Sequence, residues 1–301
     1  MEIQRFDFKN IDISAVEVPK TIIEMQNNIT PKCKNLNVLG EFVDSDINAI
    51  AVVGSRKITN YGKRACKEIV SVLAAAGVTI VSGLMYGADI EAHKTAIASG
   101  GRTIAVLGYG INNLNKYRYA KDVADEIILK KCGCIISEYP DLETAKGWTF
   151  PQRNRIVSGL SKAVIIIEAG MKSGSLITAG YALDQGKTVF VVPGSIFNPV
   201  SKGSHFLIKQ GATLIDDPFD VINYLGISSN PVKFSDQSKK AESKLEMGIV
   251  NLLSREVSPL CIEDICASLY SNLYDVNLAL TSLEMQKKIK KDIIGNWEVS
   301  I

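Results

Sequence analysis

Short apolar runs alternate with longer amphipathic stretches between about residues 50 and 225. The apolar runs are rich in β-branched residues, which is typical of buried strands. They predict strands at Ile50–Val53, Thr79–Ser82, Thr103–Leu107, Gly133–Ser137, Ala163–Ile167, Thr188–Val192 and Thr213–Ile215. The stretches between them predict helices at Tyr61–Ala76, Gly87–Ser99, Ala120–Lys130, Asn154–Leu160, Ser175–Gln185 and Ser204–Gln210. Continuous apolar strands separated by helices indicate an α/β fold, with an extended, Rossmann-like, doubly wound and mostly parallel sheet.

The pattern changes on both sides of this region. Residues 1–45 are polar and irregular, and we interpret them as a short lead-in segment, a reduced N-terminal domain with one short helix near Ile22–Met25. Residues 46–226 form the Rossmann-like domain, and residues 227–243 have the composition of a linker. Residues 244–301 predict three short helices and a hairpin, which is typical of a small winged-helix domain.

Glycine follows or lies near the end of almost every predicted strand. The strand-end segments are Gly54–Lys57, Gly83–Asp89, Gly108–Gly110, Glu138–Pro140, Glu168–Gly170, Ser173–Ser175 and Pro193–Ser195. A single tight turn often needs glycine for its backbone conformation. Glycines at so many turns on one edge favour a shared ligand crevice, because doubly wound sheets bind ligands at the carboxyl ends of their strands.

The first of these turns combines glycine with a cation. Gly54, Ser55 and Arg56 lie between an apolar strand and a helix, an arrangement that points backbone N–H groups at an anion. The G-x-G-x-x-G spacing of a dinucleotide loop is missing, and Arg56 lies where such a site has only backbone. We therefore predict that this turn contacts a phosphate group.

A second basic segment precedes an apolar helix. Arg153 and Arg155 flank Asn154 at a predicted helix start, where the helix dipole disfavours cations. Cations placed against that preference indicate an anion near these three residues. The alternative is that an arginine pairs with a carboxylate such as Asp141, Glu143 or Glu168.

A third turn contains Ser173, Gly174 and Ser175 at another predicted helix start. Hydroxyl groups and free N–H groups at such a position hold phosphate. Ordinary N-capping explains the same residues, and the two roles are compatible.

No group of residues indicates catalysis. Asp89 and His93 are four residues apart on one helix, and we favour a structural hydrogen bond because no nucleophile accompanies them. Glu138 and Glu168 end strands on the ligand side, and we expect them to hold the two arginines in place. We predict no catalytic residues, no metal and no cofactor.

Composition adds three constraints. The 301 residues include 34 basic and 32 acidic side chains, so a net charge of +2 binds nucleic acid only if the basic groups are clustered. The six cysteines lack paired C-x-x-C spacing, which disfavours zinc. No signal-peptide core or run of about 18 apolar residues occurs, so we expect a cytoplasmic protein without a membrane partner.

The order of these motifs resembles the DNA-processing protein A (DprA/Smf) family, over residues 35–225. The motifs are Val53–Lys57, Tyr61-Gly62, Ile80–Leu84, Ala92-His93, Gly100–Gly108, Ser137–Pro140, Phe150–Ile156, Gly159–Ser161, Glu168-Ala169, Ser173–Thr178, Val192–Gly194 and Gly211-Ala212. The carboxyl-terminal region is similar to the winged-helix domain of many members.

The resemblance implies a function and two partners. The family binds single-stranded DNA without catalysis, protects incoming DNA during natural transformation and DNA uptake (competence), and loads the RecA recombinase for DNA recombination. Members dimerise through the Rossmann domain, so a homodimer is expected. The family's DNA-binding positions fall on Arg56, Arg153 and Arg155, and a loop lysine of the family aligns with Arg118. The usual Tyr-Pro of that loop is missing, and Met85-Tyr86 replaces a smaller pair.

Two alternatives stay open. One is an enzyme or sensor of a related Rossmann-like family that binds a small nucleotide, although the Pro-Gly-Gly-x-Gly-Thr motif of the phosphoribohydrolases is absent. The other is a scaffold whose carboxyl-terminal domain recruits partners.

Three aromatic residues are consistent with binding of single-stranded DNA. Tyr86, Tyr109 and Phe150 lie near the strand-end turns, where aromatic side chains stack on unpaired bases.

Overall fold

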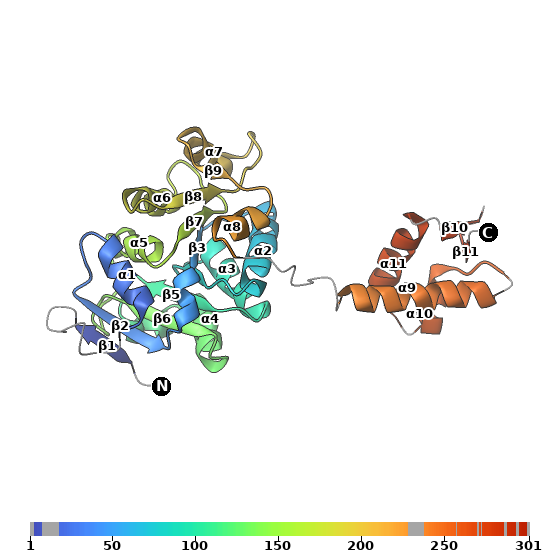
Figure 1. Cartoon of the computed structure of the whole chain (residues 1–301), viewed down its shortest axis with the longest axis horizontal. Coiled ribbons are helices and arrows are strands. Elements are labelled where there is room, and N and C mark those ends of the chain that lie inside the picture. Colours follow the sequence, from blue (N-terminus) through green and yellow to red (C-terminus); the bar gives the residue numbers. More distant parts are fainter. Residues whose placement is uncertain are drawn as a thin grey trace. The chain divides into compact units, whose positions relative to one another are not determined.

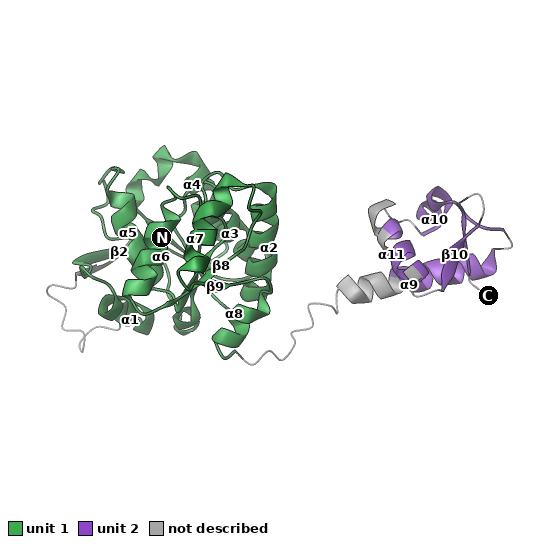
Figure 2. Cartoon of the chain, turned by 90° about the horizontal axis from the view of Figure 1, so that it is seen from above, with its two compact units in different colours: residues 1–229 green, residues 230–301 purple. Residues whose placement is uncertain are grey.

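A computed structural model of the chain describes residues 3–7, 18–227, 238–256, 258–269, 271, 273–285, 288–292 and 295–299. The chain divides into two compact units, residues 1–229 and residues 230–301 (Figure 2). Within the described residues, no helix has the length and apolar character needed to cross a membrane.

A single twisted sheet organises the described part of unit 1. Its nine strands are β1 (Gln4–Asp7), β2 (Asn35–Gly40), β3 (Ile50–Val53), β4 (Ile80–Ser82), β5 (Thr103–Leu107), β6 (Gly133–Ser137), β7 (Ala163–Ile166), β8 (Thr188–Val191) and β9 (Thr213–Leu214). They are ordered β1-β2-β6-β5-β4-β3-β7-β8-β9. Strands β3 to β9 pair in parallel, whereas β1 and β2 are antiparallel additions.

Helices cover both faces of the sheet (Figure 1). One face carries α1 (Lys20–Asn28), α5 (Thr149–Gly159), α6 (Ser175–Asp184) and α7 (Lys202–Lys209). The other carries α2 (Asn60–Ala75), α3 (Ala88–Ala98), α4 (Arg118–Leu129) and α8 (Phe219–Tyr224). Short 3-10 helices are η1 (Asp44–Asn48), η2 (Ile111–Lys116) and η3 (Pro199–Ser201). Because side chains alternate along a strand, Ala51 and Val53 pack with the first layer, while Ile50 and Val52 pack with the second.

The predicted fold class is confirmed. All seven predicted strands are present in the sheet, and their ends differ from the prediction by at most one residue. Strands β3 to β7 are buried at every position, so their apolar signal is continuous and easily recognised, whereas both residues of β9 are exposed.

The lead-in segment contains more structure than expected. Besides α1, which includes the predicted short helix, it contributes strands β1 and β2, which were not predicted. Strand β2 pairs with β6, and Leu36 and Val38 are buried beneath α1. Asn35 and Asn37 alternate with these apolar residues, and their polarity obscured the strand in the sequence. In the fold, the Asn37 side chain donates a hydrogen bond from Nδ2 to the Tyr139 carbonyl at 2.7 Å.

Helix α5 begins five residues earlier than predicted, at Thr149. Pro151 lies in its first turn, where a missing N–H costs nothing because that group has no partner in the helix. Arg153 and Arg155 therefore lie in the second turn. The interpretation that they stand at the helix start, against the dipole, is wrong.

Unit 2 contains three helices and a hairpin among its described residues. They are α9 (Ser238–Arg255), α10 (Ile262–Leu269), α11 (Leu273–Met285), β10 (Ile289–Lys291) and β11 (Trp297–Val299). The strands pair antiparallel, and Ile249, Leu280 and Trp297 belong to its core. Helix α9 begins inside the stretch predicted as a linker, and residues 228–237 of that stretch lie outside the described part of the chain. The element order is the one expected of a winged helix, and that assignment stays a prediction.

Asp46 joins the lead-in segment to the starts of two central strands. Its side chain is fully buried and accepts hydrogen bonds from Val43 N and Thr79 Oγ1, both at 2.8 Å. Arg102 donates from Nε and Nη2 to the two carboxylate oxygens at 3.0 and 3.1 Å. Thr79 immediately precedes β4 and Arg102 immediately precedes β5, so one carboxylate fixes three segments.

We expect Asp46→Ala to lower the free energy of unfolding by about 3 kcal/mol, because it leaves Arg102 without its buried partner. The control is Glu126→Ala, which removes an exposed pair between Glu126 and Lys130 on α4 and has a much smaller effect. Urea unfolding followed by circular dichroism measures both. Equal stability losses in the two variants would contradict this role of Asp46.

Candidate nucleic-acid interface

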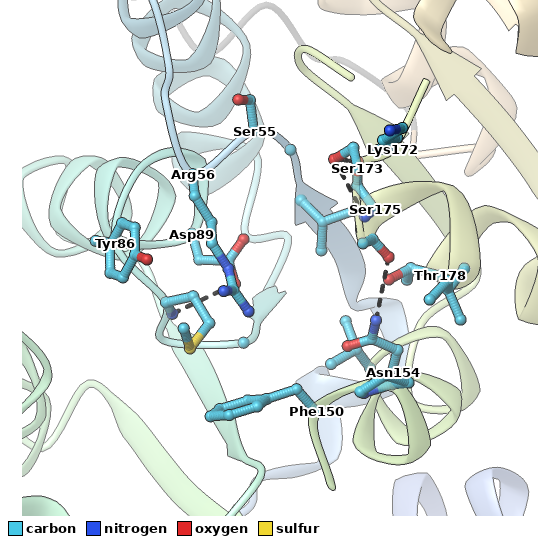
Figure 3. A pocket seen from close by; sticks show the side chains of 18 of the residues that line it. Ser55, Arg56, Tyr86, Asp89, Phe150, Asn154, Lys172, Ser173, Ser175 and Thr178 are labelled. Atoms are coloured by element: carbon cyan, nitrogen blue, oxygen red, sulfur yellow. Dashed lines mark hydrogen bonds between the residues drawn. The ribbon is translucent and has the colours of Figure 1, made fainter. Parts of the chain in front are cut away.

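A pocket of about 620 Å³ opens at the carboxyl edge of the parallel strands (Figure 3). Strand β3 lies between β4 and β7, and the chain reverses its winding direction there, so the pocket lies at the topological switch point of the sheet. The turns after β3, β4 and β7 and the first turns of α5 and α6 supply its walls. The lining residues that could bind a ligand are Gly54, Ser55, Arg56, Lys57, Met85, Tyr86, Asp89, Phe150, Arg153, Asn154, Lys172, Ser173, Gly174, Ser175 and Thr178.

The lining is strongly basic. Among its described residues are four cations, Arg56, Lys57, Arg153 and Lys172, and one carboxylate, Asp89. The whole chain has a net charge of only +2, so positive charge is concentrated here. A concave site lined by one sign of charge focuses the field and attracts anions.

Close backbone packing positions the turn that carries Arg56. A Cβ atom on Gly54 would lie 2.8 Å from Ala88 Cβ, so only glycine fits there without a shift. The Ala88 N–H donates to the Ser55 carbonyl at 3.2 Å, which joins this turn to the start of α3. The Arg56 side chain is exposed and extends into the pocket beside Tyr86 and Phe150 (Figure 3).

Arg153 forms the back of the pocket. Its side chain is buried, and its Nη1 donates to the Val106 carbonyl, while its Nε has no hydrogen-bond partner in the described structure. A Cβ atom on Gly83 would lie 2.2 Å from Nη1, so this glycine makes room for the guanidinium. Burial lowers the pKa of Arg153, and the nearby charge of Asp89 opposes that shift. A buried cation whose hydrogen bonds are incomplete attracts an anion strongly.

Asp89 is the carboxylate that faces the four cations of the pocket, and its pKa is raised. Burial raises the pKa of the Asp89 carboxyl to about 6, and the charge of Arg153 opposes the rise. The carboxylate accepts a hydrogen bond from Met85 N at 3.4 Å. His93 instead pairs through Nδ1 with Thr103 Oγ1 at 2.6 Å, so the hydrogen bond expected between Asp89 and His93 is absent from the described contacts.

The opposite wall is the N-terminus of α6. The Oγ atoms of Ser173 and Ser175 lie 2.7 Å apart, and Asn154 donates from Nδ2 to the Gly174 carbonyl at 3.3 Å (Figure 3). The Ser175 N–H donates weakly to Ser173 Oγ at 3.4 Å, so capping accounts for part of this turn. The positive end of the helix dipole adds to the attraction for an anion.

Two predicted contact residues do not line this pocket. Arg155 is almost completely buried, and its Nη2 donates to Glu138 Oε2 at 2.6 Å, so its charge is satisfied within the protein. The expectation that Glu138 holds an arginine is confirmed. The buried position of Arg155 does not support the prediction that this residue contacts DNA. Arg118 is exposed at the first position of α4 and is absent from the pocket lining.

Two further expectations are corrected by side-chain contacts. Glu168 accepts hydrogen bonds from Thr59 N at 2.8 Å and Thr59 Oγ1 at 2.6 Å, so it fixes the start of α2 and holds neither arginine. Tyr109 is 2% exposed and packs on Tyr117 with ring centroids 4.6 Å apart, so its ring is unavailable to a base.

Sequence reasoning missed Lys172. This residue lies in the turn after β7, between Gly170 and Ser173, and lines the pocket. The available signal was its position between two of the strand-end segments, Glu168–Gly170 and Ser173–Ser175, neither of which included it.

The fold and the pocket together define a doubly wound α/β protein with an anion-binding site at its switch point. The sequence model of the family described as DNA recombination-mediator protein A matches residues 13–226. The chain therefore belongs to that family, and the resemblance to DNA-processing protein A is confirmed.

Similarity to individual proteins supports the family assignment. The chain is 46% identical over 189 residues to Protein Smf of Escherichia coli K12, which covers 61% of this chain and 50% of the relative. It is 42% identical over 176 residues to the DNA processing protein DprA of Bacillus subtilis 168, which covers 58% of each. The matched region thus spans only about half to three fifths of these relatives.

Solved structures support the same fold. The X-ray structure of DNA processing protein A from Streptococcus pneumoniae superimposes with a TM-score of 0.63 at 32% identity, covering 74% of each chain. The structure of DNA processing protein A from Helicobacter pylori, described for its single-stranded DNA binding mode, gives a TM-score of 0.62 at 28% identity. It covers 74% of this chain and 95% of the other.

The raised pKa of Asp89 predicts a pH effect on stability. The folded protein binds this proton more tightly than the unfolded chain, whose aspartates titrate near pH 3.9. The resulting stabilisation is complete below about pH 4 and is lost as pH rises through about 6. Relative to Asp89→Asn, the wild type therefore loses about 3 kcal/mol of unfolding free energy over that interval. Urea unfolding at several pH values measures this difference, and a difference independent of pH would exclude the raised pKa.

Proposed function

We propose that this chain is a non-catalytic, single-stranded DNA-binding protein that protects incoming DNA and loads the RecA recombinase during natural transformation. The observation that carries the proposal is the basic pocket at the switch point. Four cations and a helix N-terminus line this pocket together with one carboxylate, Asp89, whose pKa is raised. The further elements of the proposal are a homodimer, a cytoplasmic location and a carboxyl-terminal domain that takes part in DNA or partner binding.

The chemistry of the pocket suits a flexible phosphate chain. Phosphate contacts dominate the affinity of nucleic-acid binding and are supplied by Arg, Lys and backbone N–H groups. Arg56, Lys57 and Lys172 are the accessible cations, and Arg153 adds a fixed positive charge from behind. Glycine at positions 54 and 83 lets other groups approach the backbone closely.

The names of the relatives point the same way. The Bacillus subtilis relative and both solved structures are named DNA processing proteins, and the Helicobacter pylori structure is described for binding of single-stranded DNA. Transfer of that activity to this chain, and of RecA loading, is part of the proposal.

A small nucleotide is the second candidate ligand. The volume of about 620 Å³ falls within the range of ordinary small-molecule pockets. One titration separates the candidates, namely a labelled oligo-dT strand and a panel of nucleotides at two salt concentrations. Tight, salt-dependent oligonucleotide binding without nucleotide turnover favours the proposal. Tight binding of a nucleotide with no affinity for oligo-dT would overturn it.

We expect Arg56→Ala and Lys172→Ala each to weaken oligo-dT binding and to reduce the slope of log affinity against log salt by about one. Each variant removes one accessible cation that releases a counterion on binding.

Lys209→Ala is the matched control for Lys172→Ala. Lys209 is exposed in the last turn of α7, which leads into β9, so it lies at the opposite edge of the sheet from the pocket. Fluorescence anisotropy over a salt series measures all three variants. Equal salt slopes for Lys172→Ala and Lys209→Ala would place the strand outside this pocket.

A further inference from the structure

Tyr86 presents an aromatic ring at the mouth of the pocket. It follows β4 in the segment Leu84–Gly87, lines the pocket and remains 47% exposed, which is high for a large ring beside a buried turn. Tyr119 on α4 supports this ring edge-on, with centroids 5.6 Å apart and an interplanar angle of 82°. The support fixes the orientation of the Tyr86 ring and leaves part of its surface open.

The backbone beneath Tyr86 is held in an unusual conformation. Leu84 has φ +54°, which is rare for a branched residue, and Gly87 has φ +92°. A Cβ atom on Gly87 would lie 2.3 Å from the Ser55 carbonyl oxygen and 2.7 Å from Arg56 Cα. The Tyr86 turn is thus packed directly against the Arg56 turn, so the ring and the cation are placed relative to each other by backbone contact.

Arg56 lies between two aromatic rings. Its Cζ is 5.7 Å from the centroid of Tyr86 and 5.7 Å from that of Phe150 (Figure 3). Both contacts lie within the range of cation–π attraction. A phosphate bound by Arg56 would therefore lie close to the exposed ring of Tyr86.

We propose that Tyr86 is a base-stacking platform, which takes an unpaired base of the strand whose phosphate Arg56 binds. The inference rests on the proposed function and adds a second contact of different chemistry. Stacking on an aromatic face is tolerant of base identity, so the platform adds affinity without sequence preference. It also gives a role to the Met85-Tyr86 pair, which departs from the smaller pair expected in the resemblance.

The test compares Tyr86→Leu with wild type on two strands of equal length, oligo-dT and an abasic strand with the same phosphates. We expect Tyr86→Leu to lose about tenfold or more in affinity for oligo-dT, the size of one base–aromatic stack. Its affinity for the abasic strand and its salt slope stay those of wild type. Tyr86→Phe, which keeps the ring, binds both strands like wild type.

Tyr224→Leu is a matched control. Tyr224 is 46% exposed and has an edge-on aromatic neighbour, Phe190, at 5.4 Å, but it ends α8 outside the pocket. We expect it to bind oligo-dT like wild type, and a loss equal to that of Tyr86→Leu would overturn the inference. Unchanged oligo-dT binding by Tyr86→Leu, or an equal loss on both strands, would also overturn it. In either case, weakened binding by Arg56→Ala leaves the proposed function standing.

Discussion

The pocket depends on the absence of side chains at the carboxyl edge of β3 and β4. Gly54 meets Ala88, Gly83 meets Arg153 and Gly87 meets Ser55, each at a distance too short for an added Cβ. These contacts bring two strand-end turns together and leave space for a buried guanidinium between them. A methyl group at any of the three positions would push apart the segments that carry Arg56, Tyr86 and Arg153.

Positive charge is concentrated at the pocket rather than spread over the chain. Cations of two kinds line the pocket, namely the exposed Arg56, Lys57 and Lys172 and the buried Arg153. The buried cation, Arg153, is offset by Asp89, and burial raises the pKa of that carboxyl to about 6, so Arg153 loses its negative partner as the pH falls through this value. Because Arg56, Lys57, Arg153 and Lys172 are clustered around the pocket, a nearly neutral chain presents a strongly basic site.

The sequence predicted the central fold well, because a strand buried on both faces has a continuous apolar run. It missed the four-residue strand β1, and it missed β2, in which alternating asparagines resemble a loop. It also placed the start of α5 five residues too late. The principle that doubly wound sheets bind ligands at the carboxyl ends of their strands predicted that the Arg56 and Ser173 turns share one site, and both line the pocket. It did not separate Arg153 from Arg155, since two residues along a helix turn the side chain to a different face, where Glu138 satisfies the second arginine. Such pairing depends on tertiary packing and has no local signal.

The two antiparallel strands that the lead-in segment adds have a consequence for how the sheet meets other molecules. The sheet ends in strand β1 of four residues on one side and in strand β9 of two residues on the other. Short terminal strands offer few unpaired backbone groups, and this protects a sheet from edge-to-edge growth. Recognition by this domain is therefore expected to use side chains and turns rather than strand addition, and the hydrophobic central strands are covered on both sides by neighbouring strands.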